Sequence, residues 1–117
     1  MKLIYCVEDD ASIRELIVCA LKTADFEIEG YEDYQGLSES MKKRVPDLIL
    51  LDIMVPKTDG FAMLKLIKQD PSYRSIPVIM LTAKSMEIDK VKCLEGGADD
   101  YITKPFGILE LIARIKA

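Results

Sequence analysis

The chain contains no histidine among its 117 residues, and this absence removes several kinds of active site. Ser-His-Asp and Cys-His catalysis both depend on an imidazole, and His-rich zinc sites need several of them. A domain that carries a phosphohistidine is excluded for the same reason. A catalytic or metal site in this chain must therefore use carboxylates, hydroxyls, ammonium groups or backbone atoms.

Cysteine is also scarce. The three cysteines are odd in number and widely spaced, and no CxxC pair occurs, so neither a zinc site nor a redox dithiol is indicated. Cys6 stands inside an apolar run and is expected to be a small core residue. Free cysteines fit a reducing compartment, and we expect a cytoplasmic location.

Long apolar runs and excess positive charge are missing as well. No run approaches the roughly 20 residues that cross a membrane, and the N-terminus turns acidic too soon for a signal peptide. The net charge of −4 argues against nucleic-acid binding by this segment alone. The phosphate-binding pattern GxxxxGK[ST] does not occur. Residues 1–117 are expected to form one domain.

The chain alternates apolar runs with segments of helical periodicity five times. The predicted strands are Lys2–Val7, Glu27–Tyr31, Asp47–Leu51, Pro77–Thr82 and Asp99–Thr103. The predicted helices carry Ile13 to Ala24, Tyr34 to Met41, Phe61 to Ile67, Ser85 to Leu94 and Ile108 to Ile115. Asp10 and Ser12 are candidate N-caps of the first helix, and Ser12 and Glu15 have capping-box spacing. The pattern predicts an α/β fold with a doubly wound, five-stranded parallel sheet in the order 2-1-3-4-5.

Carboxylates stand where two neighbouring strands of this sheet end. The first strand is followed by Glu8, Asp9 and Asp10, and the third by Asp52. Ligands of open parallel sheets bind outside the carboxyl ends of the strands, where the strand order reverses, and here that point lies between strands one and three. Clustered carboxylates repel one another unless one is protonated or a cation is bound. Hard oxygen ligands without His or Cys suit Mg²⁺.

Two further residues fall at the same edge. Thr82 ends the fourth strand, and Lys104 follows the fifth. A carboxylate beside Mg²⁺, a hydroxyl and an ammonium group is a plausible phosphoryl acceptor. Taken singly, Asp52 could be a capping residue, the acidic run a solvated surface, and Lys104 a surface cation. Their joint placement at the ends of strands of one sheet favours a functional site.

The motifs "VEDD", "LILLDIMVPKTDGF", "PVIMLTA" and "GADDYITKPF" resemble the receiver domain of two-component response regulators, a flavodoxin-like (βα)5 fold. The resemblance covers essentially the whole chain. It implies that Asp52 accepts a phosphoryl group from a phosphohistidine of a sensor kinase. It makes Asp9 a direct and Glu8 a water-mediated Mg²⁺ ligand, with a further ligand from the Met54 carbonyl. Thr82 would hydrogen-bond the phosphoryl group, and Lys104 would pair with it.

The resemblance also implies a switch and an output. Tyr101 matches an aromatic position that rotates on activation, and Lys104-Pro105 matches a cis peptide. Val55 and Thr58 depart from the methionines that are common between the phosphoacceptor and the following Asp-Gly. Five charged positions match the phosphorylation-dependent dimer face of the winged-helix (OmpR/PhoB-type) transcription factor subfamily: Lys90, Asp99, Asp100, Glu110 and Arg114. These charges could also be ordinary surface charges, with Glu110 and Arg114 as an i,i+4 helix pair.

Several functional alternatives remain open at this stage. The resemblance favours a switch without metabolite turnover, joined to a C-terminal DNA-binding domain that lies outside this chain. A stand-alone or constitutive receiver that acts as a protein-binding module is one alternative, and a receiver of a non-DNA-binding output enzyme is another. An aspartate-nucleophile phosphatase would need a second acid two residues after Asp52, where this chain has Met54.

Overall fold

Five parallel strands form the centre of the computed structural model, which describes residues 2–55, 58–82, 91, 95–103 and 107–117. The strands are β1 (Leu3–Val7), β2 (Glu27–Tyr31), β3 (Leu48–Asp52), β6 (Val78–Thr82) and β7 (Asp100–Thr103). They lie in the order β2-β1-β3-β6-β7, which confirms the predicted order 2-1-3-4-5.

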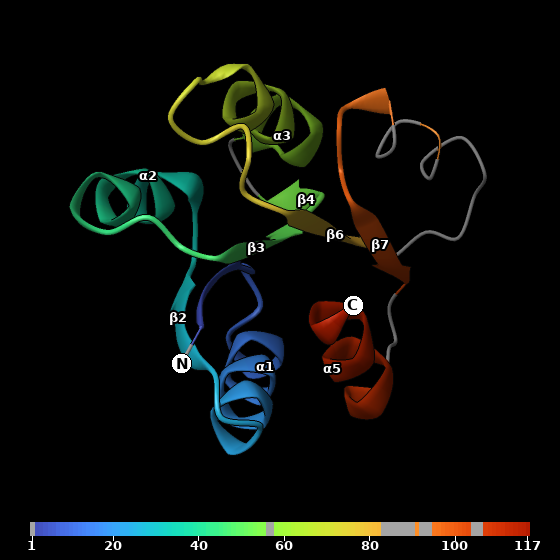
Figure 1. Ribbon diagram of the computed structural model, residues 1–117. Helices are drawn as coiled ribbons and strands as arrows, with labels where there is room; N and C mark the ends of the chain where they lie inside the picture. The colour runs from blue at the N-terminus through green and yellow to red at the C-terminus, as the bar shows by residue number, and fades with distance from the viewer. Residues whose placement is uncertain (1, 56–57, 83–90, 92–94, 104–106) are drawn as a thin grey trace.

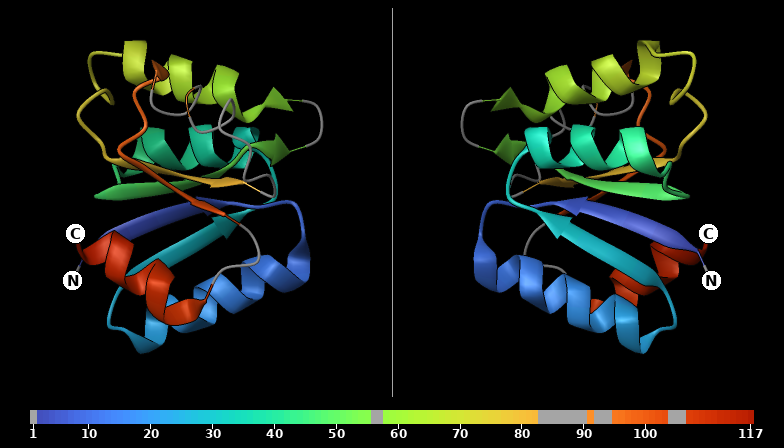
Figure 2. Two further views of the ribbon diagram at one scale, coloured as in Figure 1. Left: turned by 90° about the vertical axis from the view of Figure 1, so that its right-hand side faces the viewer. Right: turned by 90° about the vertical axis from the view of Figure 1, so that its left-hand side faces the viewer.

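Helices cover both faces of this sheet (Figure 1). The described helices are α1 (Ala11–Thr23), α2 (Tyr34–Lys43), α3 (Gly60–Gln69) and α5 (Ile108–Lys116). The views of Figure 2 show α2 and α3 on one face and α1 and α5 on the other. The predicted helix from Ser85 to Leu94 lies outside the described residues, apart from residue 91. Among the described residues, no helix is long and apolar enough to cross a membrane.

Two separate hydrophobic clusters follow from the alternation of side chains along the strands. In β1 and β3 the odd-numbered residues, such as Tyr5, Ile49 and Leu51, pack with α2 and α3, whereas the even-numbered ones, such as Cys6 and Leu50, pack with α1 and α5. Cys6 is fully buried, as expected, and Cys19 is exposed. The continuous apolar character of the central strands thus reflects burial on both faces.

The boundaries differ from the sequence prediction in ways that have local causes. Asp10 is the N-cap of α1 and accepts a hydrogen bond from the Ile13 amide at 3.1 Å. Of the two candidate N-caps, Asp10 is confirmed, and Ser12 lies inside the first turn. Asp47 precedes β3 instead of starting it, because its carboxylate accepts the Leu3 amide at 2.7 Å.

A small second sheet was not predicted. The short strands β4 (Met54–Val55) and β5 (Thr58–Asp59) pair antiparallel between β3 and α3. The segment from Asp59 to Asp70 was expected to form the third helix; because Asp59 pairs in β5, α3 begins one residue later, at Gly60. Two-residue strands carry too little periodicity to be recognised in a sequence.

Candidate functional site

Three carboxylates meet at the carboxyl end of the sheet. β1 and β3 are neighbours, with Val7 paired to Leu51, so the residues that follow them reach the same edge. One carboxylate oxygen from each of Glu8, Asp9 and Asp52 lies within 4.8 Å of the others. The convergence expected from the strand order is therefore observed. The fourth acid of this region, Asp10, caps α1 instead.

Burial makes this cluster electrostatically unusual. Glu8 is 1% exposed and Asp52 is 3% exposed, and they are the two buried charged residues in the described part of the chain, while Asp9 is exposed. Two like charges about 4 Å apart repel by about 4 kcal/mol at an effective dielectric constant near 20. A divalent cation would relieve this repulsion. The donor set, three carboxylates at an edge open to water through Asp9, fits Mg²⁺, which keeps several of its waters.

Arg14 supports Glu8 from α1. Its Nη1 donates to the Glu8 carbonyl oxygen at 2.7 Å, and the Asp10 amide contacts the Glu8 carboxylate at 3.4 Å. Gly30 on β2 leaves room for this arginine, because a Cβ there would lie 2.8 Å from Arg14 Cγ. Arg14 was not predicted to belong to the site, since an arginine on an amphipathic helix carries no sequence signal of such a contact.

The backbone around Asp52 is held from three elements. The Ile53 amide donates to the Leu81 carbonyl of β6 at 3.0 Å, and the Gly60 amide donates to the Ile53 carbonyl at 3.0 Å. From α2, the buried Tyr34 hydroxyl donates to the Asp52 carbonyl oxygen at 3.1 Å. Neither Tyr34 nor Gly60 was predicted to belong to the site. Tyr34 was interpreted as a core residue of its helix, and Gly60 as part of the third helix.

The other predicted site residues are placed in part. Thr82 ends β6, and its neighbour Leu81 pairs with Asp52, so the backbone of Thr82 lies at the same edge; its side chain lies outside the described part. Met54 stands in β4, two residues after Asp52. Tyr101 is half-buried in β7 and packs against the α2–α3 cluster. Lys104 and Pro105 lie outside the described residues.

The predicted dimer-face charges make contacts within the chain. Arg114 Nη1 lies 2.9 Å from an Asp100 carboxylate oxygen, and Arg114 Nη2 lies 3.9 Å from Glu110. Donating a hydrogen bond to the Asp100 carboxylate raises the pKa of the Arg114 guanidinium above its ordinary value. Asp99 accepts the Val78 amide at 2.8 Å and lies 3.4 Å from Lys68 Nζ. Lys90 lies outside the described residues.

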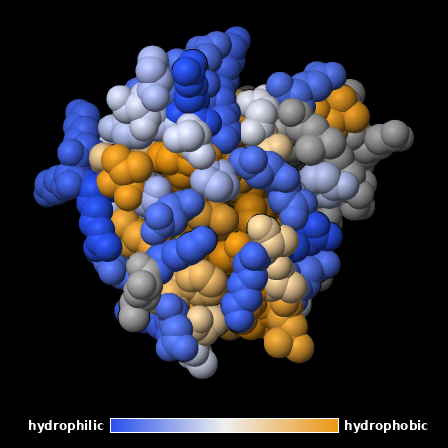
Figure 3. All heavy atoms as spheres, viewed as in Figure 1, coloured by the Kyte–Doolittle hydropathy of each residue, from blue (hydrophilic) through white to orange (hydrophobic). Residues whose placement is uncertain are grey.

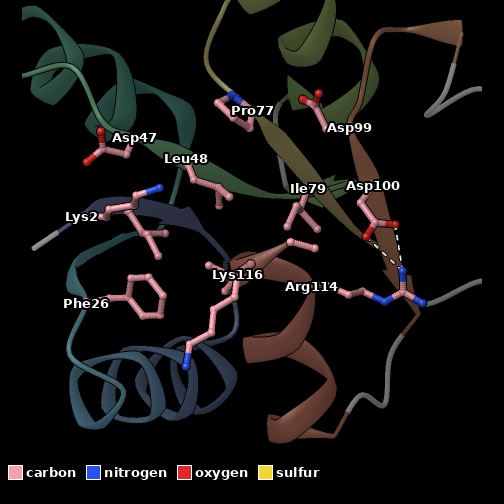
Figure 4. A pocket seen from close by; sticks show the side chains of 13 residues that line it. Lys2, Phe26, Asp47, Leu48, Pro77, Ile79, Asp99, Asp100, Arg114 and Lys116 are labelled. Atoms are coloured by element: carbon pink, nitrogen blue, oxygen red, sulfur yellow. Dashed lines mark hydrogen bonds and ion pairs between the residues drawn. The ribbon is translucent and has the colours of Figure 1, made fainter.

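A cavity of about 420 Å³ lies at the opposite, amino edge of the sheet. Figure 3 shows apolar side chains exposed between charged ones on this side of the molecule, and Figure 4 shows the residues that line the cavity. Its apolar wall includes Phe26 and Ile79, and its rim carries Lys2, Lys116 and the Asp100–Arg114 pair. None of the three clustered carboxylates lines it, so this cavity is separate from the candidate metal site.

Comparison with known proteins agrees with this geometry. Residues 4–116 match the family described as the response regulator receiver domain. The phosphate regulon transcriptional regulatory protein PhoB of Klebsiella pneumoniae is 49% identical over 114 residues, which are 97% of this chain and 50% of that protein. The DNA-binding dual master transcriptional regulator RpaA of Synechocystis is 38% identical over 118 residues, covering 100% of this chain and 48% of the relative. The chain thus spans about half the length of these curated relatives.

Solved structures show the same architecture. A putative response regulator from Chloroflexus aurantiacus superposes with a TM-score of 0.93 at 30% identity, covering 98% of this chain and 94% of that one. The receiver domain of the sensor histidine kinase PA1611 from Pseudomonas aeruginosa, solved with magnesium coordinated in its active site cleft, superposes with a TM-score of 0.88 at 29% identity. That match covers 98% of this chain and 94% of the kinase receiver.

Proposed function

The chain belongs to the family of response regulator receiver domains, and from this membership we propose that Asp52 accepts a phosphoryl group from a phosphohistidine of a sensor kinase. In this transfer the phosphorus–nitrogen bond of the phosphohistidine breaks and a phosphorus–oxygen bond to the Asp52 carboxylate forms. The imidazole leaves with the electron pair, and Asp52 becomes an acyl phosphate. The chain acts as a switch and turns over no metabolite.

One observation carries the proposal: Asp52 is buried, yet its carboxylate lies within 4.8 Å of those of Glu8 and Asp9. We assign these three residues, with the Met54 carbonyl, as the group that holds Mg²⁺, Glu8 through a water molecule. Bound Mg²⁺ would neutralise charge on the carboxylates and on the transferring group. The metal-bound relatives support this assignment: besides the kinase receiver described above, the response regulator Rcp1 was solved in a Mn²⁺-bound form.

Thr82 and Lys104 complete the proposed phosphoryl site. The Thr82 hydroxyl would donate to a phosphoryl oxygen, and the Lys104 ammonium group would pair with the added charge of about −1.5 to −2. Drawing these residues toward Asp52 shifts the population between two arrangements of the segments after β6 and β7, and rotation of Tyr101 accompanies that shift. The proposed consequence is a changed surface over the fourth helix, β7 and α5.

The output is proposed from the relatives, which are transcriptional regulators about twice as long as this chain. We propose that phosphorylation drives homodimerisation through the charged face of Lys90, Asp99, Asp100, Glu110 and Arg114. DNA binding would then belong to a C-terminal domain, because the net charge of −4 disfavours phosphate contacts by this segment. The proposed location is the cytoplasm, where a sensor kinase presents its phosphohistidine.

Phosphorylation is tested by incubating the chain with acetyl phosphate and Mg²⁺ and measuring its intact mass. The wild type is expected to gain the mass of one phosphoryl group, and both Asp52→Asn and removal of the metal with EDTA should abolish the gain. Asp10→Asn is the matched control, because asparagine is as good an N-cap as aspartate and Asp10 lies outside the cluster. A wild type without added mass, or an Asp52→Asn variant that still gains it, would overturn the proposal.

A further inference from the structure

We propose that Tyr34 is a positioning residue for phosphorylation: its hydroxyl fixes the backbone of Asp52 and thereby the direction of the acceptor carboxylate. This inference rests on the proposed function, because it assigns Tyr34 a part in the reaction at Asp52. The Tyr34 hydroxyl contacts the Asp52 carbonyl oxygen, which is not one of the reacting atoms. It acts through the peptide group between Asp52 and Ile53.

The contact itself is well sheltered from water. Tyr34 is 4% exposed, and its hydroxyl donates to the Asp52 carbonyl oxygen at 3.1 Å. Because the Tyr34 ring is packed among other side chains, the position of its hydroxyl is restricted. The ring belongs to the cluster between the sheet and helices α2 and α3, together with Leu51, Met63 and Leu64.

The geometry explains why Tyr34 reaches the carbonyl and not the carboxylate. Side chains alternate along β3, so Leu51 faces the α2–α3 cluster and the Asp52 side chain leaves on the other side. The Asp52 carboxylate accordingly lies with Glu8 and Asp9, while Tyr34 approaches the peptide group from α2. The hydroxyl can therefore steer the acceptor without competing for the cation or the phosphoryl group.

Two further contacts leave this peptide group little freedom. The Leu81 carbonyl accepts the next amide, that of Ile53, at 3.0 Å, and Gly60 approaches so closely that a Cβ there would lie 2.7 Å from the Asp52 oxygen. Tyr34 adds a side-chain hydrogen bond to the Asp52 carbonyl. Without its hydroxyl, rotation of the peptide group would tilt the Asp52 Cα–Cβ bond and displace the carboxylate.

Such a displacement matters because the carboxylate must face two partners at once. One oxygen faces the carboxylates of Glu8 and Asp9 and the cation they would hold, and the carboxylate must also line up with the incoming phosphorus. Group transfer is sensitive to this alignment, and a misplacement of about 1 Å can lower a rate about 10²-fold. A smaller tilt should have a smaller but measurable effect.

Tyr5 provides a matched control for a merely structural role. It is also buried, belongs to the same cluster and donates its hydroxyl to a backbone carbonyl, that of Arg44, at 2.9 Å. Tyr5→Phe and Tyr34→Phe therefore remove the same group from the same side of the sheet. Only Tyr34→Phe removes it from the peptide group of Asp52.

The test measures phosphorylation of the wild type and both variants by acetyl phosphate over a range of concentrations. With Tyr34→Phe we expect the rate constant at saturating acetyl phosphate to fall by about 3- to 10-fold, with the half-saturating concentration little changed, since alignment and not binding is lost. Tyr5→Phe should phosphorylate like the wild type. The Asp52 carbonyl ¹³C chemical shift provides a second readout, expected to change in Tyr34→Phe and not in Tyr5→Phe.

Each outcome decides the matter. Wild-type rates in Tyr34→Phe, an equal loss of rate in both variants, or an unchanged Asp52 carbonyl shift would overturn the positioning role. If the wild type accepts no phosphoryl group at all, the proposed function fails, and the role assigned to Tyr34 fails with it. A slow Tyr34→Phe beside a normal wild type and Tyr5→Phe supports both.

Discussion

At the scale of single residues, Gly60 comes closer to the backbone of Asp52 and Ile53 than a side chain would allow. A Cβ on Gly60 would lie 2.6 Å from Ile53 Cα, 2.7 Å from the Asp52 carbonyl oxygen and 2.9 Å from the Ile53 carbonyl oxygen. All three neighbours are backbone atoms, which cannot rotate away as the end of a flexible side chain can. The glycine of the Asp-Gly pair is thus required by close approach at the site.

Replacing this glycine should disturb both stability and metal binding. Gly60→Ala would push the Asp52–Ile53 backbone aside, and overpacking of this kind costs about 1–3 kcal/mol. We expect a lower urea midpoint and weaker Mg²⁺ binding, measured by denaturation and by metal titration. Gly107→Ser is the control, because a Cβ at Gly107 meets nothing within 4 Å and serine is a good N-cap for α5. Equal stability and metal affinity in Gly60→Ala and the wild type would refute the close-approach argument.

At the scale of elements, Lys68 ties the end of α3 to the strands β6 and β7. Its Nζ donates to the Ile76 carbonyl at 2.8 Å and approaches Asp99 at 3.4 Å, and its side chain is 18% exposed. Asp99 in turn accepts the amide of Val78, the first residue of β6. Although Asp99 was predicted for the dimer face, its contacts in the chain are those of a residue that fixes the start of a strand.

Replacing Lys68 with methionine removes the ammonium group and keeps most of the carbon chain, so it tests the polar contacts of Lys68 separately from its packing. Lys68→Met should lose about 1–2 kcal/mol of unfolding free energy, because the Ile76 carbonyl and the Asp99 carboxylate lose a charged donor. Lys65→Met, at an exposed position of the same helix, serves as the control and should leave stability nearly unchanged. Equilibrium urea unfolding of both variants measures the difference. A loss of equal size in the two variants would count against the role assigned to Lys68.

The elements themselves were largely predictable because their signals are local. Apolar runs such as Leu48 to Leu51 gave the strands, and the periodic residues Ile17, Leu21, Leu111 and Ile115 are buried in α1 and α5 as expected. What the sequence could not decide was which of two polar residues would cap α1, since Asp10 and Ser12 both have suitable side chains. The β4–β5 pair was not predicted, because its two-residue strands are too short to show a periodic pattern.

At the scale of the whole molecule, the parallel topology explains why part of the candidate site was predictable. It was possible to predict that Glu8, Asp9 and Asp52 lie close together, because neighbouring parallel strands end at one edge of the sheet. Arg14, Tyr34 and Gly60 could not, because each acts on a backbone atom of another element. In the sequence they look like a charged helix residue, a core aromatic and a glycine of the third helix, and only the tertiary arrangement reveals the contacts.

The proposed dimerisation requires charges of α5 and β7 to change partners. In the monomer Arg114 already pairs with Asp100, both partly exposed, and such pairs contribute little when solvated. Replacing the Arg114–Asp100 pair within one chain by the same pair between two chains therefore costs little free energy. The free energy that favours the dimer would come from the surface altered by phosphorylation. Since exposed charges are screened by salt, the dimer should weaken as the ionic strength rises.

A charge exchange between two variants tests this interface directly by sedimentation equilibrium, with acetyl phosphate and Mg²⁺ present. We expect phosphorylated wild type to dimerise, and Arg114→Glu and Asp100→Arg each to stay monomeric, because like charges would face each other across the two-fold axis. Mixing the two variants should restore a dimer, since opposite charges then meet at both contacts. Lys42→Ala, an exposed cation at the end of α2, is the control and should dimerise like the wild type. A wild type of the same mass before and after phosphorylation, or a mixture that stays monomeric, would show that this face does not join two copies of the chain.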